Sequence, residues 1–279
     1  MAASAPTSSG QERRPLILVS NDDGIHAPGL AVLVEAMRPL GRVVVCAPEG
    51  ERSGAGHSMT FHTHLRANEI RDGWWAVAGT PVDCVYFGLV HLCRQAAPDL
   101  VVSGINAGYN LGSDVFYSGT VGAAAEGHMR GRAGLAVSAE RGVDPRWAAH
   151  ASRVVARHML AAGGNRLLSV NVPHAAGSEQ ADAAAIDAKS KTMPFCVTRL
   201  GTRVYQDEVL ERRDPSGRAY YWIGGPPGDV RGTPGDDLWA VDQGMVSVTP
   251  LHMDITAPDL KATQSLLAND PDITVRESS

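Results

Sequence analysis

The chain has few aromatic residues, no closely spaced cysteines and no long apolar run. Aromatic side chains make up 5% of its 279 residues, and its four cysteines lack the spacing of a zinc ribbon or a redox motif. No segment approaches the apolar length of a membrane span, and residues 1–14 contain no apolar signal-peptide region. The net charge of −5 favours neither nucleic acid nor an anionic membrane as a partner. We therefore predict a cytoplasmic protein that binds no nucleic acid polymer and no membrane.

The composition is that of an ordinary globular protein. The hydrophobic fraction is 44% and the charged fraction 20%, both near the averages for folded domains. A chain of this length can bury a large core, either as one domain or as a domain with an extension. Residues 1–14 are small and polar, and we predict a disordered N-terminal tail there.

Strand-like and helix-like patterns alternate over the first two-thirds of the chain. Short apolar runs predict strands, and apolar residues at helical spacing predict helices between them. The expected strands span residues 16–19, 42–47, 75–78, 100–102, 135–137 and 167–172, and the expected helices 28–37, 80–90, 120–129 and 148–160. This order predicts an α/β fold with a mostly parallel sheet and helices on both faces.

The alternation ends after Pro173. The segments that follow are a β-hairpin pattern at 195–222 around turn residues 214–217, a glycine- and proline-rich stretch at 224–235, and a strand at 245–249 that Pro250 ends. The predicted divisions are an α/β core at 15–188, a C-terminal extension with the hairpin and returning strand at 189–257, and a C-terminal tail at 258–279. The aromatic cluster at 220–222 is expected to pack on another subunit or on the chain's own core.

Two adjacent carboxylates, Asp22 and Asp23, directly follow the first predicted strand. Neighbouring side chains in a strand point to opposite faces, so both can serve one site only where the extended chain ends. Open α/β sheets bind their ligands outside these carboxyl ends. The pair predicts either a divalent-cation site or an ordinary turn with a helix cap, since Asn, Asp and Gly all favour turns.

Glycine-rich polar loops follow two other predicted strands and precede a helix, at residues 48–58, 103–112 and 117–120. In a parallel sheet such loops emerge at one edge, so we expect them to converge around the two aspartates. Two familiar phosphate motifs are excluded. Leu30 and Ala31 stand where a Walker A loop has Lys and Ser or Thr, and the glycines at 54 and 56 lack the third glycine of a dinucleotide fingerprint.

Other polar residues have structural explanations that suffice. His57 is either a proton donor at the rim of its loop or, as we favour, a solvent-facing residue. His62 and His64 are expected on the outer face of an edge strand at 60–65. Asp83 lies in the first turn of a predicted helix, where a carboxylate supports the helix start. We place none of these four in the site.

Five motifs together resemble the SurE family of metal-dependent nucleotidases, the stationary-phase survival proteins. They are NDDG after the first strand, ERSGAGHS after the second, GTPVDCV, VSGINAGYNLG and YSGTVGAAAEG, in the family's order and approximate spacing. The resemblance covers about residues 15–255. It implies a Rossmann-like core, a C-terminal extension used to form a homodimer or homotetramer, and hydrolysis of nucleoside monophosphates.

The resemblance implies metal ligands at Asp22, Asp23, Ser53 and Asn106. All four offer oxygen, which Mg²⁺ and Mn²⁺ prefer; one such ion per subunit is implied, with Ca²⁺ as a substitute in crystals. The substrate contacts expected from the same motifs are Asn21, Ser103, Gly104, Asn110, Ser118, Gly119 and Thr120. Ser118 and Thr120 are alternatively plain helix caps, but we favour phosphate contact at the positive end of the helix.

The predicted activity is hydrolysis of nucleoside 5′-monophosphates to nucleoside and phosphate, with 3′-monophosphates and short polyphosphate as further candidate substrates. Asp22, Asp23 and Asn106 are the predicted catalytic residues, and Asp22 is expected to act as a ligand rather than a nucleophile. The alternative is a nucleotide- or metal-binding sensor without turnover in an oligomeric assembly. One departure concerns Tyr109, because many relatives have proline there; its ring is expected to stack on a base or to pack in the fold.

Overall fold

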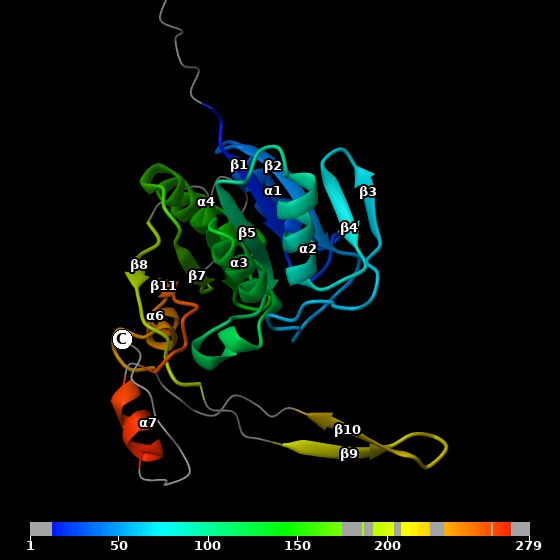
Figure 1. Ribbon diagram of the computed structural model, residues 1–279, viewed down its shortest axis with the longest axis vertical. Coiled ribbons are helices and arrows are strands. Elements are labelled where there is room, and N and C mark those ends of the chain that lie inside the picture. The colour runs from blue at the N-terminus through cyan, green and yellow to red at the C-terminus, as the bar shows by residue number, and fades with distance from the viewer. Residues whose placement is uncertain are drawn as a thin grey trace, which may run out of the picture.

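A computed structural model describes residues 13–174, 186, 192–203, 208–223, 232–257 and 259–268. Within them the chain folds around a nine-stranded sheet in the order β3-β4-β2-β1-β5-β6-β7-β11-β8 (Figure 1). The strands are β1 (Leu16–Ser20), β2 (Arg42–Pro48), β3 (Ala67–Arg71), β4 (Trp74–Val77), β5 (Leu100–Ala107), β6 (Ala133–Ala139), β7 (Leu167–Val172), β8 (Phe195–Val197) and β11 (Val246–Leu251). Within this sheet only β3 with β4 and β7 with β11 pair antiparallel, so the predicted mostly parallel sheet is confirmed.

Helices cover both faces of the sheet, as the sequence predicts. Those that pack on the sheet are α1 (Pro28–Met37), α2 (Pro81–Phe87), α3 (Gly119–Met129) and α4 (Pro145–Ala162). Ile17 and Val19 of β1 join the hydrophobic cluster that α1 and α4 form on one face. Leu18 between them joins the cluster with α2 and α3 on the other face. Because both faces of β1 are buried, the strand is apolar without alternation.

Two short helices complete the connections of the core. A π-helical turn, η1 (Gly88–Leu92), continues directly from α2, and a 3₁₀ helix, η2 (Gly112–Phe116), precedes α3. Among the described residues no helix is both long and apolar enough to cross a membrane.

Asp83 has the structural role predicted for it, and it explains one wrong prediction. Thr80 and Asp83 form a capping box at the start of α2, in which each side chain accepts a hydrogen bond from the other's backbone. The same carboxylate accepts hydrogen bonds from the backbone N–H and hydroxyl of Thr60, at 2.8 and 2.6 Å. These bonds hold the Thr60 segment as a loop. The edge strand predicted at 60–65 is therefore wrong, and the edge of the sheet is β3.

Strand β5 is longer than its apolar run. The sequence predicts that a loop begins at Ser103, but β5 continues to Ala107. Ser103 pairs with Ala136 of β6, and after a shift in register Asn106 pairs with Ser138. The strand therefore carries polar side chains past the apolar sheet centre and toward its carboxyl edge.

Strand β11 also continues past its predicted end at Pro250. Pro250 lies opposite Leu168 of β7, whereas β8 pairs only with Val246–Val248 on the other side of β11. The missing N–H of this proline therefore falls where the second side of the strand is open, a position that tolerates proline. A short helix, α6 (Asp237–Asp242), precedes this strand.

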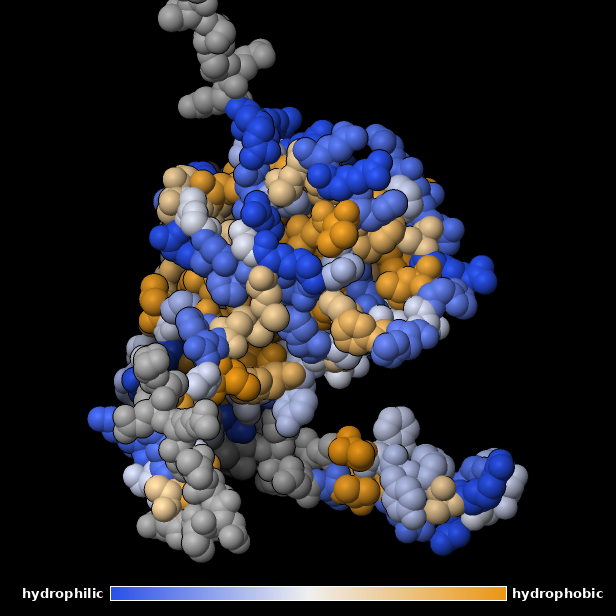
Figure 2. Space-filling view, viewed as in Figure 1, coloured by the Kyte–Doolittle hydropathy of each residue, from blue (hydrophilic) through white to orange (hydrophobic). Residues whose placement is uncertain are grey.

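The predicted hairpin is present as a separate two-stranded sheet of β9 (Val209–Arg213) and β10 (Ala219–Ile223). The Asp214 carboxylate forms the turn by accepting hydrogen bonds from the backbone of Ser216 and Arg218. Figures 1 and 2 show the hairpin extending from the body of the molecule, with hydrophobic residues at its base. Tyr221, Trp222 and Ile223 are 59%, 63% and 90% exposed, so these residues do not pack on the chain's own core.

The predicted N-terminal and C-terminal tails lie only partly within the described residues. Helix α7 (Leu260–Leu267) lies within the predicted tail and buries none of its residues. In the predicted N-terminal tail, Arg13 forms an ion pair with Asp99 at 2.6 Å. Residues 1–12, 224–231 and most of 175–191 lie outside the described residues.

Helix α3 lies unusually close to the sheet because small residues face each other there. A Cβ atom on Gly134 of β6 would come within 2.3 Å of the Ala124 carbonyl oxygen of α3 and 2.9 Å of Leu167. No side chain fits this space without moving the helix or the strand.

We expect Gly134→Ala to lower the free energy of unfolding by about 2 kcal/mol, because the added methyl overpacks the contact between α3 and β6. Gly50→Ala is the matched control: an added Cβ there meets no atom within 4 Å. Urea unfolding measures both variants. Equal stability of the two variants would contradict the close packing of α3.

Candidate active site

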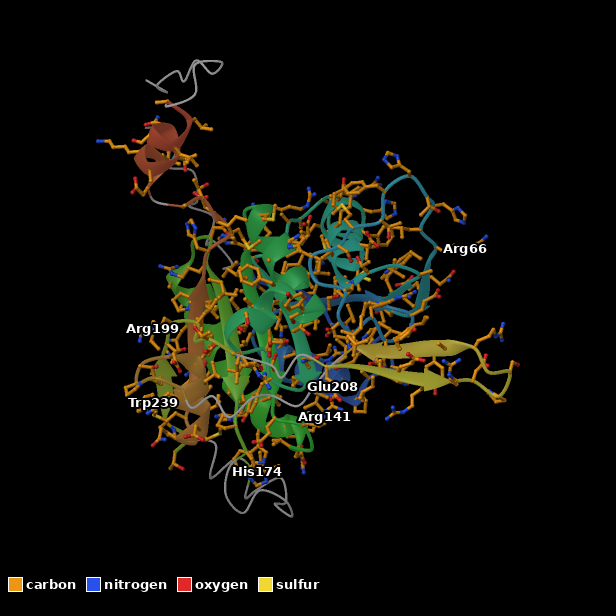
Figure 3. All side chains as sticks on the ribbon, turned by 90° about the horizontal axis from the view of Figure 1, so that it is seen from below. Arg66, Arg141, His174, Arg199, Glu208 and Trp239 are labelled. Carbon is orange, nitrogen blue, oxygen red and sulfur yellow. The ribbon has the colours of Figure 1, made fainter. Side chains whose placement is uncertain are left out.

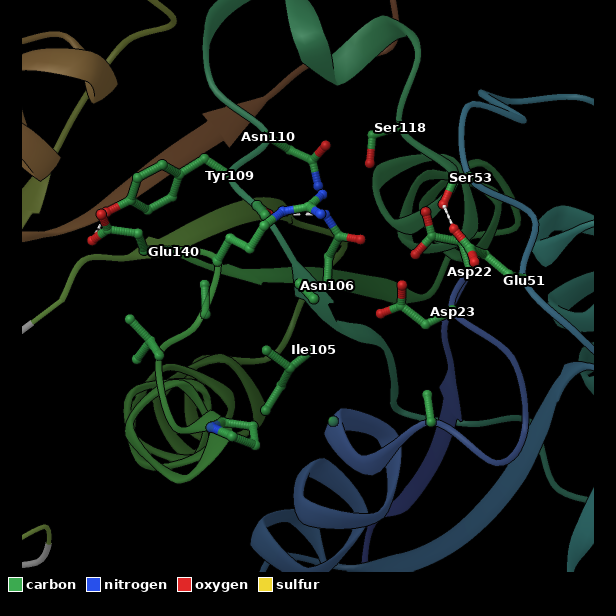
Figure 4. Close-up of a pocket in the computed structure, with 18 of the residues that line it drawn as sticks. Asp22, Asp23, Glu51, Ser53, Ile105, Asn106, Tyr109, Asn110, Ser118 and Glu140 are labelled. Atoms are coloured by element: carbon green, nitrogen blue, oxygen red, sulfur yellow. Dashed lines mark hydrogen bonds between the residues drawn. The ribbon is translucent and has the colours of Figure 1, made fainter. Parts of the chain in front are cut away.

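A pocket of about 830 Å³ opens at the carboxyl edge of the sheet. Its wall is formed by the loops after β1, β2 and β6, the end of β5 and the segment before α3 (Figure 4). The chain leaves β1 toward β2 on one side, whereas β5 lies on the other side of β1. The pocket therefore lies at the point where the strand order reverses, where α/β sheets bind ligands.

Asp22 and Asp23 both line this pocket. Asp22 is 4% exposed, and the Thr120 hydroxyl donates a hydrogen bond to its carboxylate. Burial raises the pKa of Asp22 above its usual value, against the hydrogen bond from Thr120. Burial and the neighbouring charge of Asp22 raise the pKa of Asp23 to about 6. A cation bound between these carboxylates would stabilise their ionised forms, which their surroundings otherwise disfavour.

Ser53 and Asn106 line the same pocket and offer neutral oxygen atoms. The Ser53 hydroxyl donates a 2.7 Å hydrogen bond to Glu51. The Asn106 amide nitrogen donates to the carbonyl oxygen of Gly108 at 2.8 Å, which leaves its oxygen available. Figure 4 shows this oxygen directed toward Asp23. The structure thus brings all four predicted metal ligands to one pocket, with only oxygen donors, as Mg²⁺ or Mn²⁺ requires.

The predicted ligand set has two carboxylates, fewer acidic groups than many metal sites. Among the described residues there is no group of three or more His, Cys, Asp or Glu side chains placed to hold a metal ion. A shell of two carboxylates, a hydroxyl and an amide leaves coordination positions for water and for a phosphate oxygen, which suits Mg²⁺.

The first turn of α3 lies directly against Asp22. Ser118 is the N-cap of this helix and accepts a 3.1 Å hydrogen bond from the backbone N–H of Val121. Its side chain also lines the pocket, so the cap and a phosphate contact are compatible. A Cβ on Gly119 would lie 2.9 Å from the Cβ of Asp22. The positive end of α3 is therefore as close to the carboxylates as the backbone permits.

Of the other predicted substrate contacts, one lines the pocket and five do not. Asn110 lines the pocket, and its amide nitrogen donates a 2.8 Å hydrogen bond to Ser138. The pocket-lining residues do not include Asn21, Ser103, Gly104, Gly119 or Thr120. Asn21 instead donates a 2.9 Å hydrogen bond to the carbonyl of Gly24, which shapes the turn that carries the aspartates. Substrate contact by these five residues stays a prediction.

Sequence reasoning assigned no role to Glu51 or Arg141, which line the pocket, and left two roles open for Tyr109. Glu51 bonds Ser53, and its charge contributes to the raised pKa of Asp22 and Asp23. Tyr109 donates a 3.1 Å hydrogen bond to Glu140, and burial followed by the Glu140 charge raises the pKa of this tyrosine. Its ring is thereby fixed in the wall. Arg141, labelled in Figure 3, comes from the loop after β6, which no motif marks.

His57 does not line the pocket. Its ring lies 3.1 Å from Glu126 of α3, a carboxylate with 4% of its side chain exposed, which also accepts a hydrogen bond from Arg130. Burial alone would raise the pKa of Glu126, but the hydrogen bonds from His57 and Arg130 outweigh it and lower that pKa. His57 thus ties the loop of Ser53 to α3, rather than facing solvent alone.

Known proteins resemble this chain over most of its length. The family model Survival protein SurE matches residues 17–207. A protein of Syntrophotalea carbinolica named 5′-nucleotidase SurE is 45% identical over 247 residues, which cover 86% of this chain and 92% of that protein. A protein of Vibrio cholerae with the same name is 42% identical over 244 residues, which cover 86% and 92%. The crystal structure of SurE protein from Aquifex aeolicus superposes with a TM-score of 0.76 at 38% identity, covering 90% of this chain and 99% of that one.

We expect Asp23→Asn to stabilise the metal-free protein by roughly 1–2 kcal/mol at pH 7, because it removes a half-buried charge that repels the buried Asp22, an effect that solvent screening reduces. The gain should shrink as the pH falls below about 6, since Asp23 then binds a proton in the folded state. Urea unfolding in a chelating buffer measures this. Asp72→Asn, in the exposed turn between β3 and β4, is the control and should change little. A destabilised Asp23→Asn variant would show that the two carboxylates do not repel each other.

Proposed function

The chain belongs to the SurE family, and from this premise we propose that it is a metal-dependent phosphomonoesterase that hydrolyses nucleoside 5′-monophosphates to nucleoside and phosphate. The observation that carries the proposal is the position of Asp22 and Asp23. Both carboxylates face one pocket at the reversal of the strand order, beside the N-terminus of α3. A cation held there would lie next to a site suited to a phosphate group.

We propose that Asp22, Asp23, Ser53 and Asn106 hold one divalent ion per subunit, Mg²⁺ or Mn²⁺. The all-oxygen donor set and the raised pKa of both aspartates support this assignment. When bound, such an ion neutralises charge on a phosphoryl oxygen and lowers the pKa of a bound water. Ser53 and Asn106 add no negative charge, so an anionic phosphate can still bind to the ion.

The residues around the ion would then orient and stabilise the phosphate. Ser118 offers a hydroxyl at the pocket wall, and the first turn of α3, with its partial positive charge, lies directly against Asp22. These donors stabilise the equatorial oxygens as charge redistributes in the transition state. Asp22 is engaged by Thr120 and lies beside Asp23, an arrangement that favours a ligand over a nucleophile.

The pocket is larger than a phosphate group requires. Beyond Asn106 its wall continues through Ile105, Tyr109 and Val143 to Pro145. This apolar and aromatic surface suits the nucleoside of a 5′-nucleotide. We keep 3′-monophosphates and short polyphosphate as further candidate substrates. The alternative of a sensor without turnover is not favoured, since the relatives carry the name 5′-nucleotidase and all four predicted ligands face one pocket.

We further propose that the β9–β10 hairpin joins subunits into a homodimer or homotetramer. Three consecutive apolar residues of β10, including Trp222, are mostly exposed. An exposed aromatic and aliphatic surface of this kind is typical of protein interfaces. Location in the cytoplasm also stays a prediction, and the four free cysteines are compatible with it.

With AMP and Mn²⁺ we expect steady release of phosphate that a chelator abolishes and added metal restores. Asp22→Asn should lower kcat/KM by roughly a hundredfold or more, because it removes one of two anionic ligands. Asp72→Asn should keep the wild-type rate. The proposal fails if the wild type, stripped and reloaded with several metals, hydrolyses no nucleotide or simple phosphomonoester.

The double variant Tyr221→Ser, Trp222→Ser should shift the molar mass measured by light scattering from the oligomer to the monomer, because it removes aromatic contact area. Arg212→Gln on the neighbouring strand should leave the mass unchanged. A wild-type monomer, or a double variant that keeps the oligomeric mass, would contradict the proposed role of the hairpin.

A further inference from the structure

The charge of the pocket is strongly unbalanced. Five acidic residues line it: Asp22, Asp23, Glu51, Asp114 and Glu140. Asp114 is neutralised by an ion pair with Arg203, whereas the other four form no ion pair with a described residue. Among the described lining residues Arg141 is the only one with a basic side chain. A phosphomonoester carries up to two negative charges, and an acidic pocket repels it unless cationic groups compensate. One divalent ion cannot neutralise both the acidic wall and the substrate.

The loop that carries Arg141 is held firmly against the pocket. The backbone N–H of Glu140 donates a hydrogen bond to the carbonyl of Val172 at 3.1 Å, and that of Val143 donates to the carbonyl of Glu140 at 3.2 Å. The Glu140 carboxylate accepts hydrogen bonds from the Tyr109 hydroxyl at 3.1 Å and from the backbone of His174 at 2.8 Å. These contacts fix the turn between β6 and α4 to β5 and β7.

The side chain of Arg141 is free to bind a ligand. It is exposed, and within the described part of the chain it forms no hydrogen bond or ion pair with another residue. Arg141 lines the same pocket as Asp22 and Asp23, so its guanidinium can reach a small anion bound in that pocket.

We propose that Arg141 binds the phosphate group of the substrate in this pocket. This inference rests on the proposed function of the pocket. A guanidinium suits the task because it stays charged and donates two parallel hydrogen bonds to phosphate oxygens. Arg141 thus supplies the positive charge that the protein's own pocket wall otherwise lacks.

The test compares Arg141→Gln with the wild type on AMP and on p-nitrophenyl phosphate, which share only the phosphate. We expect KM to rise about tenfold for both substrates, with kcat changed less than about twofold. Arg141→Lys should raise KM less than Arg141→Gln does, because lysine keeps the positive charge but lacks the paired N–H donors of the guanidinium. Arg157→Gln removes an exposed arginine of α4 outside the pocket and is the matched control.

Two further readouts separate this inference from the proposed function. The KM of the wild type should rise with ionic strength more steeply than that of Arg141→Gln, which a purely structural role would not produce. Calorimetric binding of inorganic phosphate with Mg²⁺ present should weaken about tenfold in Arg141→Gln, whether or not the protein turns over AMP. Unchanged phosphate binding, or a KM that rises for AMP alone, overturns the assignment. A wild type that binds phosphate through Arg141 but hydrolyses nothing would overturn only the proposed function.

Discussion

The contact between Asp22 and the first turn of α3 is the constraint on which the site depends. Thr120 donates a hydrogen bond to the Asp22 carboxylate, and Gly119 leaves no room for a Cβ beside it. This contact brings the positive end of a helix and a pair of carboxylates to the same place. A single crevice can therefore attract a cation and a phosphate, two groups of opposite charge.

Much of the core follows from local sequence patterns. The apolar run that became β1 is buried on both faces, so its composition alone identifies it. The starts of α1 and α2 could be predicted because the residues that begin them act locally. Pro28 occupies the first turn of α1, and Thr80 and Asp83 cap the start of α2. Asp22 and Asp23 were found for the same reason, since a strand end followed by two acids is a local signal.

The features that were missed depend on contacts between distant residues. Polar Ser103 and Asn106 looked like loop residues, and only pairing with β6 makes them part of β5. The segment at Thr60 has the sequence pattern of a strand, but in the structure its backbone N–H donates a hydrogen bond to Asp83, more than twenty residues away. Glu51 lies in the loop at 48–58 that the sequence placed near the aspartates, but its contact with Ser53 appears only in the structure. Arg141 lies in a loop that no motif marks, and its place in the pocket follows only from the three-dimensional path of the chain.

Helix α3 has consequences for how such a protein can be redesigned. Residues 119–127 are all buried, and they are mostly glycine and alanine, so nearly every substitution adds atoms where none fit. A library built on this helix would consist mainly of misfolded variants. The turn between β6 and α4 differs, because the side chain of Arg141 is exposed there while backbone hydrogen bonds hold the turn in place. Substitutions meant to alter substrate preference are therefore best made in that turn, and α3 is best left unchanged.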